Sequence, residues 1–352
     1  MRFIWPPVAN ATILLLPQIV ATYQEQIFYR LNQERLAKTK SVNVRQEVEN
    51  EDGSIDVQLL ALDGLLLHAK VYPRENPKGI VQLIHGVLEH KGRYDDFCRY
   101  LNAQGYIVVI SDTRGHGHST NQKYPHVMMQ TVDELIFDQV LVTRFIKERY
   151  PNLPLNLFGH SLGSMIARIY LQNYDDEIEH LILTGTVTPY PLAPVGVFLA
   201  RIVVFYFGKS GHSALLNALN PGKNDTLDWI SYNLDNLDRI AKDPLCQVRL
   251  TNSGMLTMFT INARLKEIAK FQCKNPDLKI LSATGVDDTL ITGGEKGLAE
   301  SLDTLKKIGY HNITNLVYPE MKHEVIQEKN RLQVYQDIVA FIENKLKTEV
   351  KS

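Results

Sequence analysis

The sequence predicts an α/β fold built on a mostly parallel sheet of eight strands flanked by helices. Short runs of continuous apolar residues recur along the chain, which is typical of strands buried on both faces of a parallel sheet. Segments with helical periodicity separate these runs, as in the α/β class of folds. The expected strands span residues 56–60, 65–71, 79–84, 106–111, 155–158, 180–184, 278–283 and 315–318.

The first two expected strands alternate around Asp63-Gly64, a dipeptide that favours a hairpin turn. The clearest helix covers residues 131–150, where apolar residues recur at roughly helical spacing until the chain reaches Pro151. Further helices are expected over residues 163–173 and 331–347.

The composition is that of an ordinary globular protein. Of its 352 residues, 44% are hydrophobic and 22% are charged, and the formal net charge is −1. This balance gives no reason to expect a nucleic-acid partner. The three cysteines, Cys98, Cys246 and Cys273, are scattered and odd in number, so neither a disulfide framework nor a zinc site is expected. We expect reduced thiols and a cytoplasmic location.

Residues 1–34 are the unusual part of the chain. They are largely apolar up to Ala21, but prolines interrupt the run and the uninterrupted part is far too short to span a bilayer. The residues that follow favour a helix and become basic toward its end. We expect a helical arm that docks on the body or on a membrane surface, with a signal sequence or an anchor as the alternative.

Residues 188–277 break the alternation of strands and helices. The interval opens with an apolar and aromatic run and is too long for a plain loop. We expect a helical cap over the C-terminal edge of the sheet, where open α/β sheets bind ligands. An extra layer of core helices is the alternative. The core then consists of residues 35–187 and 278–352.

The segment LFGHSLGSM places Ser161 midway between Gly159 and Gly163. A buried-strand pattern precedes the serine and a helix pattern follows it, which is the setting of a nucleophile elbow. Glycine suits such a turn because it tolerates positive φ and the close approach of other backbone. The pattern therefore predicts that Ser161 projects above the sheet edge as a nucleophile, near a helix N-terminus.

A serine nucleophile needs a base and a third group that orients the base. His323 follows the last expected strand and is the only one of the eleven histidines beyond it. The acid should follow the preceding strand, because the chain order around such an elbow is serine, acid, histidine. Asp287 and Asp288 both lie there; we favour Asp288 and keep Asp287 as the alternative.

The reaction also needs backbone N–H donors for the developing oxyanion. One donor should be Leu162, the residue after the nucleophile. The other should be Val87, because the His85-Gly86 turn directly follows a buried strand and can aim the next N–H into the site.

Five segments in this order, HGVLEHKGRY, SDTRGHGHS, GHSLGS, GVDD and KHEV, resemble the monoacylglycerol lipase and lysophospholipase group of α/β-hydrolases, which is related to the serine aminopeptidase S33 enzymes. The match runs over most of residues 55–345. The resemblance implies Asp288 as the acid and agrees with Ser161, His323, Val87 and Leu162 in the roles given above.

The resemblance also implies that Glu89 and Arg93, with His90 beside them, lie near the polar head of the substrate. The alternative is a salt-bridged loop that braces the oxyanion hole. A further matching motif is assigned a structural role; it comprises Asp112, Arg114, Gly115 and Gly117.

We expect a serine hydrolase that cleaves the carboxylic ester of a monoacylglycerol or lysophospholipid through an acyl-enzyme, without metal or organic cofactor. Peripheral membrane contact is expected through the cap and residues 1–34. One alternative is a serine aminopeptidase of the same fold, which would need an acidic cap pocket for the substrate amine. Another is a non-catalytic binding module. The candidate acids for an amine pocket are Asp225, Asp228, Asp235 and Asp238.

Overall fold

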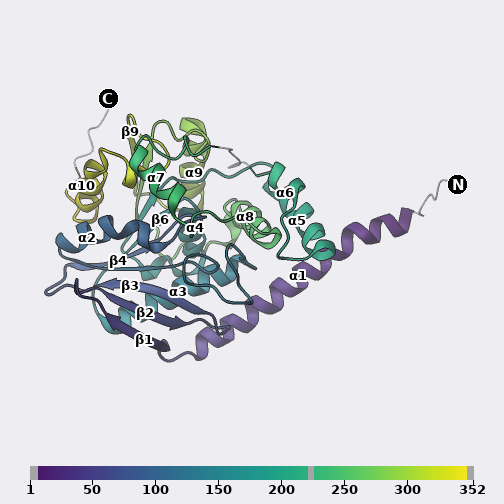
Figure 1. The fold of residues 1–352 in the computed structure, drawn as a ribbon, viewed down its shortest axis with the longest axis horizontal. Coiled ribbons are helices and arrows are strands. Elements are labelled where there is room, and N and C mark those ends of the chain that lie inside the picture. The colour runs from purple at the N-terminus through teal and green to yellow at the C-terminus, as the bar shows by residue number, and fades with distance from the viewer. Residues whose placement is uncertain (1–6, 221–225, 347–352) are drawn as a thin grey trace.

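A computed structural model describes residues 7–220 and 226–346 of the chain, and these residues form a nine-stranded sheet covered by helices (Figure 1). The strand order is β1-β2-β3-β5-β4-β6-β7-β8-β9. The pairs β1–β2, β2–β3 and β3–β5 are antiparallel, and the remaining pairs are parallel. The strands are β1 Val44–Glu49, β2 Ile55–Leu60, β3 Leu66–Tyr72, β4 Gly79–Ile84, β5 Tyr106–Ser111, β6 Leu155–His160, β7 His180–Thr184, β8 Lys279–Gly285 and β9 Ile313–Tyr318.

The predicted fold class is confirmed, and the sheet has one strand more than expected. The additional strand is β1, whose sequence VRQEVE is exposed at every position. Because β1 lies at the edge of the sheet and buries neither face, it carries no apolar pattern. Its existence depends on hydrogen bonding to β2, a tertiary contact that local sequence does not report.

Helices cover both faces of the sheet and bury its alternating side chains. On one face, Ile80 and Ile84 of β4 share a core with α3 and α4. On the other face, Val81 and Leu83 of the same strand share a core with α2 and α10. The helices outside residues 188–277 that follow the N-terminal arm are α2 Asp95–Ala103, α3 Val132–Arg149, α4 Leu162–Tyr174, α9 Gly294–Ile308 and α10 Arg331–Ile342.

The N-terminal arm is one long helix, α1 (Pro7–Lys38), which continues through Pro17. Its C-terminal part joins the core through buried Leu36, and its N-terminal half runs past α5 and away from the sheet (Figure 1). Gln18 Nε2 donates to the Phe198 carbonyl at 3.0 Å, and Arg201 pairs with Glu25 at 2.8 Å. Among the helices in the described ranges, none is long and apolar enough to cross a membrane.

Residues 188–277, called here the cap segment, contribute helices and no strand within their described part. Residues 221–225 of this segment are not among the residues that the structure describes. The helices of the cap segment are α5 Ala193–Phe207, α6 Ala214–Ala218, α7 Leu234–Lys242 and α8 Asn252–Arg264. Residues of α5, α6 and α8 share a small apolar core of their own.

Candidate active site

Ser161 occupies the turn between β6, which ends at His160, and α4, which begins at Leu162. Its backbone has φ 52° and ψ −114°, a conformation that L-residues rarely adopt. Such backbone strain persists only where surrounding contacts enforce it, and it is concentrated at functional sites. Here the Ser161 N–H donates to the Thr184 carbonyl of β7 at 3.0 Å, which holds the turn against the sheet.

Gly159 and Gly163, which flank Ser161, are required because other backbone atoms approach them closely. A Cβ on Gly163 would lie 2.1 Å from the Ile84 carbonyl oxygen, and one on Gly159 would lie 2.3 Å from the Gly163 carbonyl oxygen. Neither glycine has positive φ; that conformation belongs to the serine between them. The glycines thus let β6, α4 and the end of β4 pack tightly around a strained Ser161.

His323 and Asp288 form a buried pair. Asp288 follows β8, His323 follows β9, and His323 Nδ1 lies 2.8 Å from Asp288 Oδ2. The pair is 3% and 1% exposed at its side chains. The neighbouring Asp287 instead faces solvent, where its carboxylate accepts from the Tyr232 hydroxyl at 3.1 Å. Of the two candidate acids, only Asp288 reaches the imidazole.

The environment of His323 favours its protonated form more than water does. Burial alone would lower the pKa of His323, but the charge and the hydrogen bond of Asp288 raise it above its usual value. The ring packs against His160 at 4.8 Å and against Trp229 of the cap segment at 5.1 Å, measured between ring centroids. These contacts fix the orientation of the imidazole and shield it from bulk water.

The two predicted oxyanion donors both lie at the wall of the pocket that contains Ser161. Leu162 begins α4, so its N–H belongs to the free N-terminal turn of that helix. Val87 follows the turn at Gly86, whose N–H donates to the Glu89 carboxylate. Within the described part of the chain, neither the Leu162 nor the Val87 N–H donates to another protein group.

The loop after Val87 is only partly in the position that the resemblance implies. Glu89 lines the pocket with Ser161, whereas His90 and Arg93 do not. The Arg93 guanidinium instead lies behind the pocket wall, bound to Glu89 and to Glu324, the residue after His323. These contacts favour the interpretation of Arg93 as a brace over direct contact with a substrate head group.

His90 lies in a group with Asp243 and Cys246 whose potential ligand atoms are within 4.8 Å of one another. Hydrogen bonds within the protein occupy the imidazole of this group. His90 Nδ1 accepts from the Gly92 N–H, so the ring proton resides on Nε2 and is donated to Asp243 over 2.8 Å. The imidazole therefore presents no free lone pair to an ion. Burial also raises the pKa of the Cys246 thiol to about 12.

The motif around Asp112 and Arg114 has contacts that suit the structural role assigned to it. Asp112 is fully buried and accepts from the backbone N–H groups of Lys91 and His118. Arg114 is paired with Asp63 and Asp138. The positive φ of Gly115 and Gly117, 77° and 50°, allows the turn that places these groups.

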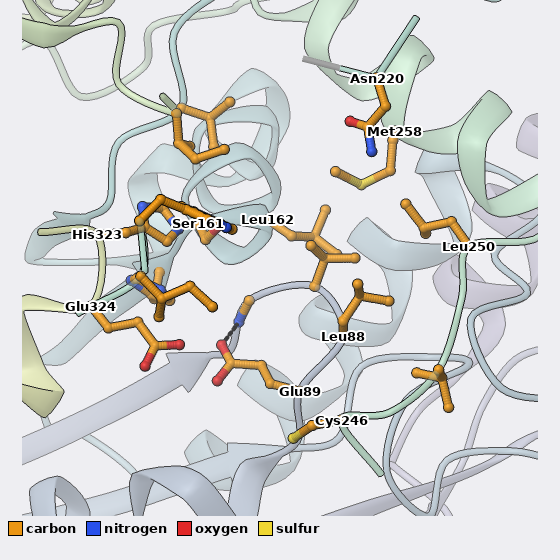
Figure 2. Close-up of a pocket in the computed structure, with 18 of the residues that line it drawn as sticks. Leu88, Glu89, Ser161, Leu162, Asn220, Cys246, Leu250, Met258, His323 and Glu324 are labelled. Carbon is orange, nitrogen blue, oxygen red and sulfur yellow. Dashed lines mark hydrogen bonds between the residues drawn. The ribbon is translucent and has the colours of Figure 1, made fainter. Parts of the chain in front are cut away.

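The pocket in front of Ser161 has a volume of about 480 Å³. Figure 2 shows Ser161 and His323 on one side of it, Leu250, Met258 and Asn220 on the other, and Leu162 between them. Between these ends the wall is mainly apolar, and the cap segment supplies most of the far side. The apolar wall residues include Leu88, Met165, Val187, Leu250, Met255, Met258 and Phe259.

Sequence reasoning did not single out Glu324, Trp229 or Asn236 as part of this site. The signal for Glu324 in the sequence is its place directly after His323 in the KHEV segment. Trp229 and Asn236 carry no comparable signal, because their approach to His323 and Arg93 depends on how the cap segment folds back.

The mostly parallel sheet, the strand–serine–helix turn and the histidine after the last strand define an α/β-hydrolase. The chain belongs to the serine aminopeptidase S33 family of these proteins, because the family model matches residues 75–330.

Individual relatives are consistent with this family. The chain is 26% identical over 273 residues to a monoacylglycerol lipase of Mycolicibacterium smegmatis, covering 77% of this chain and 90% of that protein. It is 25% identical over 286 residues to the monoglyceride lipase of Homo sapiens, covering 77% and 88%. Among solved structures, a thermostable carboxyl esterase of Bacillus coagulans superimposes with a TM-score of 0.71 at 24% identity, covering 88% of this chain and 100% of that one.

Proposed function

We propose that this protein is a serine hydrolase that cleaves the carboxylic ester of a lipid, a monoacylglycerol or a lysophospholipid, through an acyl-enzyme on Ser161. The observation that carries the proposal is the buried His323–Asp288 pair at the same pocket as a strained serine. The similarity to lipases and an esterase supports ester chemistry.

The mechanism assigns one step to each group. His323 Nε2 takes the proton from the Ser161 hydroxyl as the oxygen attacks the ester carbonyl, while Asp288 keeps the proton on Nδ1. The N–H groups of Val87 and Leu162 stabilise the tetrahedral oxyanion. The imidazolium then protonates the departing alcohol. Finally the neutral histidine activates water, which releases the fatty acid and regenerates the serine.

The pocket supports a lipid substrate. We propose that residues 188–277 act as a cap that forms most of the acyl-binding wall, with the ester carbonyl held at Ser161. Of the aspartates considered for binding a substrate amine, Asp228, Asp235 and Asp238 are exposed and do not line this pocket, and Asp225 lies outside the described residues. The pocket carboxylates Glu89 and Glu324 are already paired with Arg93. This arrangement favours an ester over an aminopeptidase substrate.

We also propose that the protein meets its substrate at a membrane surface through α1 and α5. From Pro7 to Gln24 the chain has no charged residue, and α1 exposes Leu15 by 53% and Ile19 by 65%. The neighbouring end of α5 exposes Phe207 by 76%. Apolar side chains that protrude from two adjacent helices suit insertion into the interfacial region of a bilayer.

The test of the catalytic proposal is fatty-acid release from a monoacylglycerol and a lysophosphatidylcholine of one chain length, with Ser161→Ala as the blank. Release that the substitution abolishes establishes the reaction, and the ratio of the two rates identifies the preferred head group. Absence of release from either lipid would contradict the proposed substrate class. Labelling by a fluorophosphonate, absent in Ser161→Ala, distinguishes an enzyme from a non-catalytic binding module.

A further inference from the structure

Arg93 joins parts of the site that are far apart in the chain. Its Nη1 contacts Glu89 Oε2 at 2.5 Å, and its two terminal nitrogens form a forked pair with Glu324 at 2.8 and 2.6 Å. Glu89 is the residue whose carboxylate accepts from the Gly86 N–H and the Tyr94 hydroxyl. Arg93 therefore connects the turn that presents the Val87 N–H with the loop that carries His323.

The cap segment completes the same cluster. Asn236 of α7 accepts from Arg93 Nη2 at 3.0 Å and donates to Glu324 Oε2 at 2.7 Å. The Glu324 N–H also donates to the Ile230 carbonyl at 2.9 Å, next to the Trp229 ring that packs on His323. Asn236 is 1% exposed and Glu324 is 6% exposed, so no solvent replaces these bonds while the cap is seated.

We propose that Asn236 and Glu324 are positioning residues: through Arg93 they tie the cap segment to the oxyanion turn and to the general base, so that a seated cap assembles the catalytic geometry. The inference rests on the proposed function of Ser161, His323 and the Val87 N–H. When Asn236 moves away with the cap, Arg93 and Glu324 each lose a hydrogen bond. The Gly86 turn and the His323 loop are then held less firmly.

The cluster also acts on His323 through charge. The ionisable groups that act on this imidazole are Asp288, Glu324, Glu89 and His160, and Arg93 acts on the neighbouring His160. Burial opposes ionisation of Glu324, but Arg93 lowers the pKa of Glu324 to about 2, so it is a carboxylate throughout the working range of the histidine. Its negative charge raises the pKa of His323. Removing that charge should keep the base neutral to a lower pH.

Glu324→Gln is the decisive variant, because the amide retains the shape of the side chain, removes its charge and replaces one of the two oxygens that accept from Arg93 by a donor. With a short soluble ester, we expect kcat to fall between about 10-fold and about 10²-fold, as for small displacements of catalytic groups. KM should stay within about twofold, because no acyl-binding contact changes. The acid limb of kcat/KM should move to lower pH. A merely structural contribution would lower the thermal midpoint and leave the acid limb where it is.

Asn236→Ala tests the link to the cap, with Arg239→Ala as the matched control. Arg239 is an exposed residue on the same helix. We expect Asn236→Ala to slow labelling of Ser161 by a small fluorophosphonate by about 10-fold. The control should label within twofold of the parent protein. Both are measured well below the thermal midpoints, so that unfolding does not contribute.

The results separate this inference from the proposed function. Glu324→Gln with an unchanged acid limb, or Asn236→Ala with the labelling rate of the parent, overturns the inference while the parent remains an active enzyme. A parent that hydrolyses the short ester but no lipid contradicts the proposed substrate and leaves both variants as valid tests. A parent that hydrolyses neither substrate and resists labelling overturns both proposals.

Discussion

The turn around Ser161 and the cap segment form opposite walls of one pocket, and they are built differently. At the turn, backbone from β4, β6 and α4 approaches so closely that even a methyl group at Gly163 would overlap the Ile84 carbonyl. In the cap segment the obstacle is a side chain: a Cβ at Gly196 would lie 2.6 Å from the buried ring of Phe259. The comparison indicates a rigid frame for the chemistry and a more adaptable surface for the substrate.

The polar face of the cap segment is the exception to this contrast. Around Ile230 and Asn236 the cap is held by directional hydrogen bonds to the His323 loop and to Arg93. Its other end, around α5, presents apolar side chains to solvent. The cap segment is thus attached near His323 and exposes apolar side chains at its other end.

The largest effect on kcat should follow from a substitution that breaks the pair of His323 and Asp288. Asp288→Asn should lower kcat by about 10⁴-fold, because the amide no longer stabilises the imidazolium or the required tautomer of His323. Asp287→Asn is the matched control and should stay within about twofold, since surface changes usually shift stability by less than about 0.5 kcal/mol. Steady-state kinetics on a short ester measures both. The opposite ranking would make Asp287 the acid.

Adding one methyl group to each wall tests the difference in rigidity. Gly163→Ala should destabilise the protein by about 3 kcal/mol, because the obstacle is backbone that cannot rotate away. Gly196→Ala should cost less, about 1.5 kcal/mol, because a buried side chain can shift further than backbone can. Denaturant unfolding monitored by fluorescence gives both values. Equal losses would contradict the contrast between the two walls.

The pH dependence of the activity reports the pKa of His323. His323 must be neutral to accept the serine proton, and its pKa is raised above the ordinary 6.5. Activity should therefore rise with pH through a midpoint above 6.5, falling about tenfold per unit on the acid side of that midpoint. The profile of kcat/KM on a neutral ester measures this midpoint. A value below 6.5 would mean that burial outweighs the Asp288 charge.

A bulky residue in the adaptable wall should change selectivity and leave the chemistry intact. Met258→Trp should reduce kcat/KM for a long-chain monoacylglycerol by about 10-fold, because the ring occupies the end of the pocket opposite Ser161 (Figure 2). Hydrolysis of an acetate ester should be unchanged. Leu215→Trp, at an exposed position of α6, is the control for a general effect of tryptophan on the cap. Equal losses on both esters would place Met258 outside the acyl path.

The smallest effect on catalysis is expected from substitutions in the N-terminal helix α1. Leu15→Glu should weaken retention on phosphatidylcholine–phosphatidylglycerol vesicles by about 30-fold, since burial of one leucine contributes about 2 kcal/mol and about 1.4 kcal/mol corresponds to tenfold. Hydrolysis of a soluble short ester should not change. Gln24→Glu adds the same charge at another exposed position of α1 and serves as the control. Equal vesicle binding by Leu15→Glu and the parent would exclude this face from membrane contact.

Much of the fold and part of the site follow from local sequence. Alternation around a turn predicted the first two expected strands and short apolar runs the other six, together eight of the nine strands, and the two glycines around Ser161 predicted its turn. Edge strand β1 was missed because it is exposed along its whole length. The glycines were correctly read as signs of a tight turn, but the positive φ falls on the serine itself, a choice set by the packing of β4 against α4.

By itself, the sequence determined the α/β class, the chain order of the candidate serine, acid and histidine, and the strand-to-helix turn at Ser161, because these depend on short-range periodicity and turn chemistry. The tertiary structure decided which of two adjacent aspartates meets His323, and that Arg93 binds Glu324 and Asn236 and lies behind the pocket wall. The reason is physical: Asn236 and Glu324 lie 143 and 231 positions from Arg93 along the chain. Contacts over such separations depend on how the loops and the cap segment pack over the end of the sheet.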